Sequence, residues 1–138
     1  QHGYKVIVIT NQSGVARGLF TLESLHAMHD KMQTLVLDAG GKIEAIYFCP
    51  HAPTAGCDCR KPATGMYTRF ADDYATELRH IYAIGDSYRD LEAARSCSAK
   101  AILVKTGKGL KTLASHPELT EPVFENLYEA SQYIINQS

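Results

Sequence analysis

The sequence has 138 residues, of which 45% are hydrophobic, and a formal net charge of -1. This length is sufficient for one domain with a hydrophobic core, so we expect a single domain over residues 1–138. The balanced charge argues against nucleic acid as a partner. No apolar run approaches the roughly 20 residues needed to cross a bilayer, which argues against a membrane partner.

Short apolar runs alternate with segments of helical periodicity along the chain. Strands are predicted at 5–10, 42–48, 81–85, 101–104 and 122–124. Helices are predicted from the N-cap Thr21 to Gly40-Gly41 and at 65–77, 90–96 and 127–135. This alternation predicts a Rossmann-like three-layer α/β/α fold with a mostly parallel sheet. Such sheets bind ligands beyond the carboxyl ends of their strands.

The most distinctive segment runs from Cys49 to Cys59. Three of the four cysteines and one histidine lie in it, with the spacing Cys-x-His-x5-Cys-x-Cys. Cys49, His51, Cys57 and Cys59 form a Cys3His set, which is typical of structural zinc. Disulfides are the alternative, but a bridge between Cys57 and Cys59 would be strained, and no other feature indicates a secreted cysteine-rich scaffold. The segment predicts structural zinc in a cytoplasmic, reducing compartment.

Polar residues directly follow the first predicted strand. Thr10, Asn11, Gln12 and Ser13 supply a hydroxyl, side-chain amides and loop N–H groups. This combination suits phosphate binding. The alternative is a turn that is capped by its own side chains.

A basic pair follows the cysteine segment. Lys61 can act as a point cation, and Arg60 can bind phosphate or carboxylate as a fork. The pair therefore indicates an anion site. A solvated surface pair is the alternative.

Two aspartates follow the third predicted strand. Asp86 and Asp90 are one helical turn apart, so both can face one hard cation such as Mg2+. Gly85 permits a tight turn before them. Alternatively, Asp86 or Ser87 caps the next helix, and Asp90 complements the helix dipole.

These signals, in this order, resemble the haloacid dehalogenase superfamily of phosphohydrolases. Thr10 after an apolar strand resembles the second motif of that family, and Lys61 resembles the third. Gly85-Asp86 with Asp90 resembles the fourth. The resemblance covers nearly the whole chain and implies a phosphatase.

The resemblance is closer to a zinc-containing subfamily of sugar-bisphosphate phosphatases, which is related to histidinol phosphatases. It is carried by residues 10–18, the Cys/His segment, Cys59-Arg60-Lys61-Pro62 and Val104-Lys105-Thr106-Gly107. It implies a small-molecule sugar phosphate as substrate and leaves histidinol phosphate as the alternative. A monomer is expected.

The resemblance also implies a role for each site residue. Asp86 would hold Mg2+, with Asp90 in support. Thr10 and Lys61 would contact the transferring phosphoryl group. Arg60 would bind the remaining anionic part of the substrate. The substrate pocket would be lined by Asn11, Gln12 and Ser13.

The sequence departs from the family at two points. The Asp-x-Asp of the first motif, which supplies the nucleophile and the general acid/base, does not occur in the 138 residues. We expect it upstream of Gln1, on a central strand missing from this chain. Ser87 stands where the family often has Lys or Arg. The missing motif leaves open a third hypothesis, a zinc-stabilised module without catalytic activity.

Overall fold

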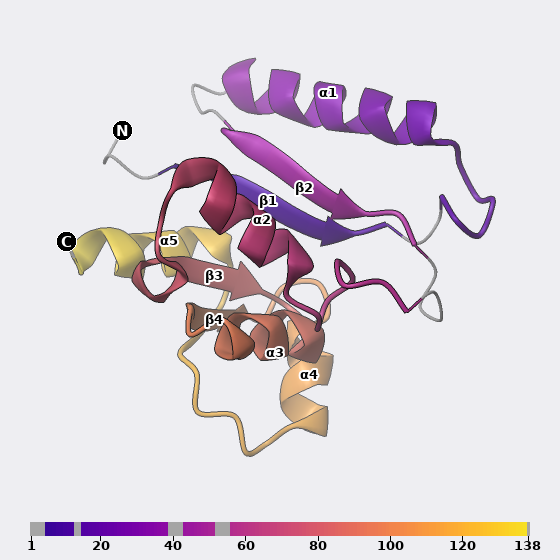
Figure 1. Cartoon of the computed structure of the whole chain (residues 1–138). Coiled ribbons are helices and arrows are strands. Elements are labelled where there is room, and N and C mark those ends of the chain that lie inside the picture. The colour runs from indigo at the N-terminus through magenta and orange to yellow at the C-terminus, as the bar shows by residue number, and fades with distance from the viewer. Residues whose placement is uncertain (1–4, 13–14, 39–42, 52–55, 138) are drawn as a thin grey trace. The chain divides into compact units, whose positions relative to one another are not determined.

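The chain forms two compact units, Gln1–Arg60 and Lys61–Ser138, in a computed structural model (Figure 1). The structure describes residues 5–12, 15–38, 43–51 and 56–137. A two-stranded parallel sheet lies in the first unit and a three-stranded parallel sheet in the second.

The first unit is a β-α-β arrangement. Its strands are β1 (Ile7–Asn11) and β2 (Ala45–Cys49), and α1 (Leu22–Asp38) connects them and lies alongside them in Figure 1. Parallel strands require such a crossover, because the chain must return to the same end of the sheet. Thr21 caps α1 as predicted, since its hydroxyl accepts the N–H of Ser24 at 3.0 Å.

The second unit has its sheet in the order β3-β4-β5. Its strands are β3 (Tyr82–Gly85), β4 (Lys100–Val104) and β5 (Val123–Phe124). Its helices are α2 (Gly65–Tyr74), the 3-10 turn Leu78–His80, α3 (Tyr88–Ser96), α4 (Gly109–Ser115) and α5 (Leu127–Asn136).

The two faces of β4 build two separate cores. Because side chains alternate along a strand, Leu103 faces one core and Ile102 the other. The first core consists of Leu91, Ala94, Ala99, Ala101 and Leu103, and the second of Ile102, Val104, Ala130 and Ile134. Helix α3 therefore covers one face and α5 the other, which confirms the three-layer α/β/α prediction within this unit.

All five predicted strands occur, and the differences concern the helices. Helix α2 ends at Tyr74 rather than at residue 77, because Ala75 adopts a left-handed conformation with φ 49°. Helix α4 was not predicted, since its seven residues are too few for a clear periodicity. The predicted end of the first helix, Gly40-Gly41, lies outside the described residues.

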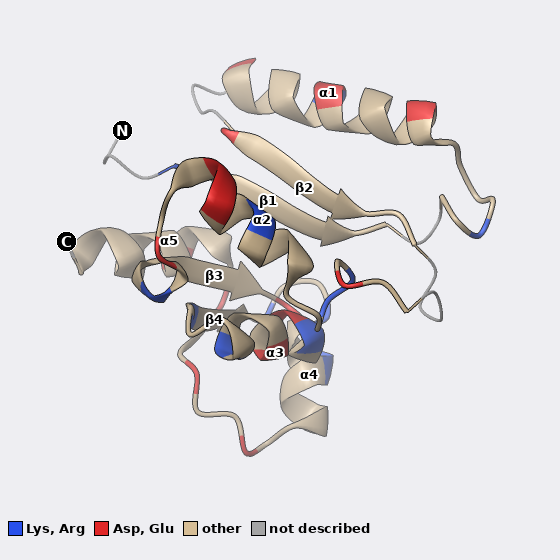
Figure 2. Ribbon diagram, in the orientation of Figure 1, with Lys and Arg blue, Asp and Glu red and all other residues tan. Residues whose placement is uncertain are grey.

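Two further observations concern the distribution of charged residues and the length of the helices. Figure 2 shows Lys and Arg interspersed with Asp and Glu along the described elements. Within the described ranges, no helix combines the length and apolar character needed to span a membrane.

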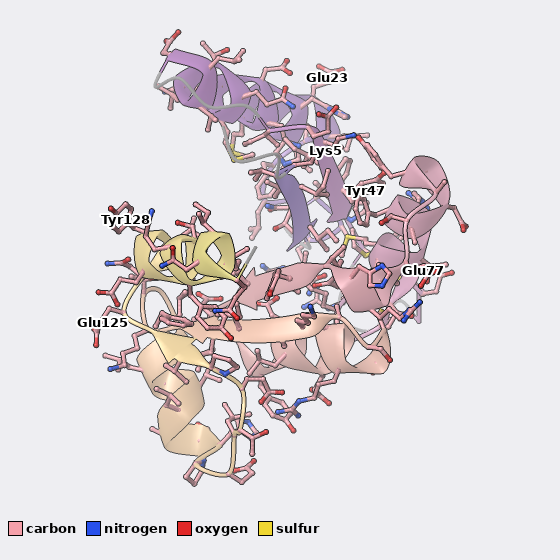
Figure 3. All side chains as sticks on the ribbon, turned by 90° about the vertical axis from the view of Figure 1, so that its left-hand side faces the viewer. Lys5, Glu23, Tyr47, Glu77, Glu125 and Tyr128 are labelled. Atoms are coloured by element: carbon pink, nitrogen blue, oxygen red, sulfur yellow. A yellow bond between two sulfur atoms is a disulfide. The ribbon has the colours of Figure 1, made fainter. Side chains whose placement is uncertain are left out.

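Helix α5 shows how local sequence and packing agree. Ala130 and Ile134 are buried against β4, whereas Tyr128 is 71% exposed and projects away from the ribbon (Figure 3). At its start, the side chain of Asn126 accepts the N–H of Glu129 at 2.9 Å. This bond satisfies one of the free donors of the first turn.

We expect Asn126→Ala to lower the free energy of unfolding by about 1 kcal/mol, because the first turn of α5 loses its cap. Urea denaturation of the full-length protein measures this change. Asn136→Ala, at the last residue of the same helix, is the matched control. Equal stability of the two variants would contradict a stabilising role for the cap.

Candidate functional site

Three of the predicted phosphate-binding residues lie at the carboxyl end of β1. Asn11 is opposite Cys49 in the strand register, and the N–H of Gln12 donates to the carbonyl of Cys49 at 2.7 Å. The side-chain amide of Gln12 also donates to the hydroxyl of Thr10 at 3.3 Å. The loop after β1 is thus joined to the start of the Cys/His segment. Ser13 lies outside the described residues.

The four predicted zinc ligands form one cluster after β2. Their donor atoms all lie within 4.8 Å of one another. Nδ1 of His51 is 3.5 Å from Sγ of Cys49 and 3.3 Å from Sγ of Cys59. Sγ of Cys57 is 3.5 Å from Sγ of Cys49 and 3.7 Å from Sγ of Cys59.

These separations match tetrahedral coordination of zinc. With Zn–S and Zn–N bonds of their usual lengths, ligand sulfurs lie about 3.8 Å apart and a sulfur and a nitrogen about 3.6 Å apart. The exception is the pair Cys49 and Cys59, which the structure joins as a disulfide with a Cα–Cα distance of 5.6 Å. Bound zinc and this disulfide exclude each other, because zinc requires both sulfurs as thiolates.

Arg60 follows the cluster directly. Its Nη1 is a buried side-chain polar atom with no hydrogen-bond partner in the described part of the chain. Buried polar groups are nearly always hydrogen-bonded, so an exception needs an explanation. A guanidinium nitrogen that lacks an acceptor is suited to bind an anionic ligand.

In the second unit, Lys61 forms an ion pair with Asp90. Its Nζ lies 2.6 Å from Oδ1 of Asp90, and the two side chains are only 13% and 16% exposed. Burial alone would raise the pKa of Asp90, but the charge of Lys61 and hydrogen bonds from Lys61 and Ser87 outweigh it. The pKa of Asp90 is therefore below its ordinary value, and this carboxylate is ionised at neutral pH.

Asp90 also organises the start of α3. Its Oδ2 accepts the backbone N–H groups of Asp86 and Ser87, both at 3.2 Å, while Ser87 Oγ accepts the N–H of Asp90 at 3.3 Å. Ser87 and Asp90 therefore form the cap that was the alternative to a metal site. Both oxygens of Asp90 have partners, so any support that it gives to Mg2+ is indirect in this arrangement.

Asp86 is placed differently. Its Oδ2 accepts the N–H of Lys108 at 2.9 Å, and its Oδ1 forms no hydrogen bond within the described residues. A Cβ on Gly107 would overlap Oδ2 of Asp86, and a Cβ on Gly85 would overlap the side chain of Asp90. Each glycine thus makes room for one aspartate. One free carboxylate oxygen fits Mg2+, which takes few protein carboxylates and completes its shell with other oxygens.

The structure thus brings together two groups of predicted residues. Within the first unit, Thr10, Asn11 and Gln12 adjoin the cysteine cluster, and Arg60 follows it. Within the second unit, Lys61, Asp86 and Asp90 form one network. Sequence reasoning missed Lys108, whose contribution is a backbone N–H. The available signal was the pair of glycines that flank it, Gly107 and Gly109, but this run is too short to indicate a phosphate-binding loop.

Comparison with known proteins gives consistent matches. The HAD-hydrolase-like family model matches residues 58–130. A Pseudomonas aeruginosa relative, D-glycero-beta-D-manno-heptose-1,7-bisphosphate 7-phosphatase, is 46% identical over 92% of this chain and 71% of its own length. A relative of the same name from Neisseria meningitidis is 45% identical over 100% of this chain and 75% of its own length.

A solved structure gives the same result. The crystal structure of D,D-heptose 1,7-bisphosphate phosphatase from B. bronchiseptica, complexed with magnesium and phosphate, matches with a TM-score of 0.93 and 43% identity. The match covers 97% of this chain and 75% of that one. The chain therefore belongs to the haloacid dehalogenase-like phosphatases, within the D-glycero-beta-D-manno-heptose-1,7-bisphosphate 7-phosphatase family.

Proposed function

We propose that the enzyme is Mg2+-dependent and removes the C7 phosphate of D-glycero-beta-D-manno-heptose 1,7-bisphosphate. The names of the relatives support this substrate and its beta anomer. The observation that carries the proposal is Asp86, with one carboxylate oxygen free in a network that also holds Lys61. The product would enter the synthesis of ADP-heptose and lipopolysaccharide precursors in the cytoplasm. The enzyme would act as a monomer.

Two cations of the chain would bind the anionic substrate. Lys61 would neutralise the transferring phosphoryl group, and its pairing with Asp90 would hold its ammonium in place. Arg60 would bind the remaining phosphate, which would satisfy its buried Nη1. Thr10 would donate its hydroxyl to the transferring phosphoryl group. The rest of the pocket would be formed by Asn11, Gln12 and Ser13.

The reaction requires a nucleophile in addition to these residues. The missing Asp-x-Asp motif would precede Gln1, on a strand central to the sheet. Its first aspartate would attack phosphorus, the P–O bond to C7 would break, and the second aspartate would protonate the leaving oxygen. Water, deprotonated by the second aspartate, would then hydrolyse the aspartyl-phosphate. Mg2+ held by Asp86 would supply charge neutralisation at the phosphate oxygens.

We expect phosphate release from the heptose bisphosphate only by a form that includes the Asp-x-Asp segment, and only with Mg2+. The 138-residue chain is the comparison, since it lacks the motif for the nucleophile. Asp86→Asn in the extended form should lose at least about 100-fold in turnover, because the metal loses a charged ligand. Phosphate release is measured with Mg2+ added or removed by a chelator.

Histidinol phosphate is the second substrate in the same assay. Faster turnover of histidinol phosphate would contradict the proposal and favour the alternative activity. If the extended form hydrolyses neither compound, the zinc-stabilised module without catalytic activity becomes the better explanation. Turnover that is independent of Mg2+ would exclude the proposed role of Asp86.

We also propose that reduced protein binds structural zinc at Cys49, His51, Cys57 and Cys59. Four protein ligands leave no open position for water, so the ion would stabilise the segment rather than take part in the reaction. The segment ends immediately before Arg60 and Lys61. The conformational order of this segment would therefore determine how firmly the side chains of Arg60 and Lys61 are positioned.

Cys57→Ala should lower the zinc content of protein purified under reductant, because the site loses one of four ligands. Activity of the full-length enzyme should fall with it. Zinc is measured by mass spectrometry of the metal and free thiols by titration. Cys97→Ala is the matched control, since Cys97 lies outside the cluster. Normal zinc content and normal kinetics in Cys57→Ala would refute the site.

Asp90→Asn should destabilise the protein by about 2 kcal/mol, because it leaves the largely buried ammonium of Lys61 without its charge partner. Turnover should also decrease, since Lys61 is no longer held in place. Denaturant unfolding and steady-state kinetics measure the two effects. Asp72→Asn, on the exposed side of α2, makes the same chemical change at a surface position. Identical behaviour of the two variants would argue against a role for the Lys61–Asp90 pair.

A further inference from the structure

The first turn of α4 holds Asp86 from two directions. The backbone N–H of Lys108, the N-cap residue of α4, donates to Oδ2 of Asp86 at 2.9 Å. The hydroxyl of Thr112 donates to the backbone carbonyl of Asp86 at 2.8 Å. One group is thus the backbone N–H of the N-cap residue, and the other is a side chain within the helix.

Among the described residues, Thr112 is the one that is both polar and buried, with 7% of its surface exposed. A buried hydroxyl requires an acceptor, and the carbonyl of Asp86 is the nearer of two. The other is the carbonyl of Lys108 at 3.0 Å, within the same helix. The contact with Asp86 joins segments that are 26 residues apart in the sequence.

Helix α4 is itself fixed against the sheet. A Cβ on Gly109 would overlap the carbonyl oxygen of Val104, so the helix begins in direct contact with the end of β4. The N–H of Gly109 also donates to the carbonyl of Thr106 at 3.1 Å, which closes the turn. The N–H of Lys108 and the hydroxyl of Thr112 therefore belong to a segment that packs directly against the sheet.

Asp86 is thus held at three points. Its N–H donates to Asp90, its carbonyl accepts from Thr112, and its Oδ2 accepts from Lys108. These bonds fix the backbone on both sides of the Cα atom and one of the two carboxylate oxygens. The direction of the remaining oxygen, Oδ1, is set as a consequence.

We propose that Thr112 is a positioning residue for Mg2+: its hydroxyl holds the carbonyl of Asp86 so that Oδ1 is oriented for the metal. This inference rests on the proposed function of Asp86. Groups that orient metal ligands typically affect metal affinity about 10–100-fold. The sequence contains no motif that marks Thr112, since its role depends on a contact with a distant segment.

The test compares Thr112→Val, which has nearly the same shape but no hydroxyl, with Thr112→Ser, which keeps the hydroxyl. In the full-length enzyme, we expect Thr112→Val to weaken Mg2+ binding about tenfold. Calorimetry with MgCl2 in the presence of inorganic phosphate measures the dissociation constant. The half-saturating Mg2+ concentration in turnover should rise by a similar factor, while kcat at saturating Mg2+ changes little. In Thr112→Ser, the dissociation constant and the half-saturating Mg2+ concentration should both equal those of the wild type.

Thr68→Val is the matched control. Thr68 also donates its hydroxyl to the carbonyl four residues earlier, that of Thr64, at 3.1 Å, and it lies on α2. Thr68→Val should therefore bind Mg2+ like the wild type. A thermal unfolding scan of each variant separates a loss of stability from a loss of metal affinity. Thr112→Ala replaces Thr112→Val if the latter does not fold.

Three outcomes would overturn the inference. An unchanged Mg2+ dissociation constant in Thr112→Val would remove the positioning role, even if the variant unfolds at a lower temperature. Equal weakening in Thr112→Ser would show that the hydroxyl is not responsible. A wild-type enzyme that neither binds nor requires Mg2+ would overturn the inference together with the proposed role of Asp86, whereas the first two outcomes leave that role intact.

Discussion

The hydrogen-bond network of the second unit depends on the carboxylate of Asp90. One oxygen binds the ammonium of Lys61, and the other binds the backbone N–H groups of Asp86 and Ser87. This one carboxylate therefore connects the side chain of Lys61, the start of α3 and the end of β3. Because the pair is largely buried, removing the carboxylate leaves donors and a charge with little access to water. The same group thus supports both the fold and the site.

Close approach at two glycines makes this network possible. Gly85 and Gly107 each lie so near an aspartate that a Cβ would overlap it. Gly107 also has a φ of 59°, a conformation that side chains disfavour. The carboxylate of Asp86 can accept the N–H of Lys108 only because no side chain separates it from this turn. Glycine occupies both positions because a larger side chain would not fit, rather than because glycine makes a favourable contact.

The sequence predicted those features that depend on local patterns. Alternating apolar runs were sufficient for the five strands and the layered fold, and donor spacing was sufficient to find the cysteine cluster. The residues Lys61, Asp86 and Asp90 were each identified by their position after a strand or loop. Their connection was not predicted, because the contact between Lys61 and Asp90 spans 29 residues. The support from α4 was also missed, because a backbone N–H such as that of Lys108 does not depend on the side chain, and the contact between Thr112 and Asp86 spans 26 residues.

The charges of this network also favour the proposed metal ion. Lys61 and Asp90 neutralise each other, whereas no cationic side chain within the described residues pairs with Asp86. A phosphate group near Asp86 would therefore meet a carboxylate of the same charge. Backbone donors such as Lys108 N–H reduce this repulsion but carry no net charge. A divalent cation on the free oxygen of Asp86 would reverse the sign of the local charge, so that substrate phosphate would be attracted to the residue that would otherwise repel it.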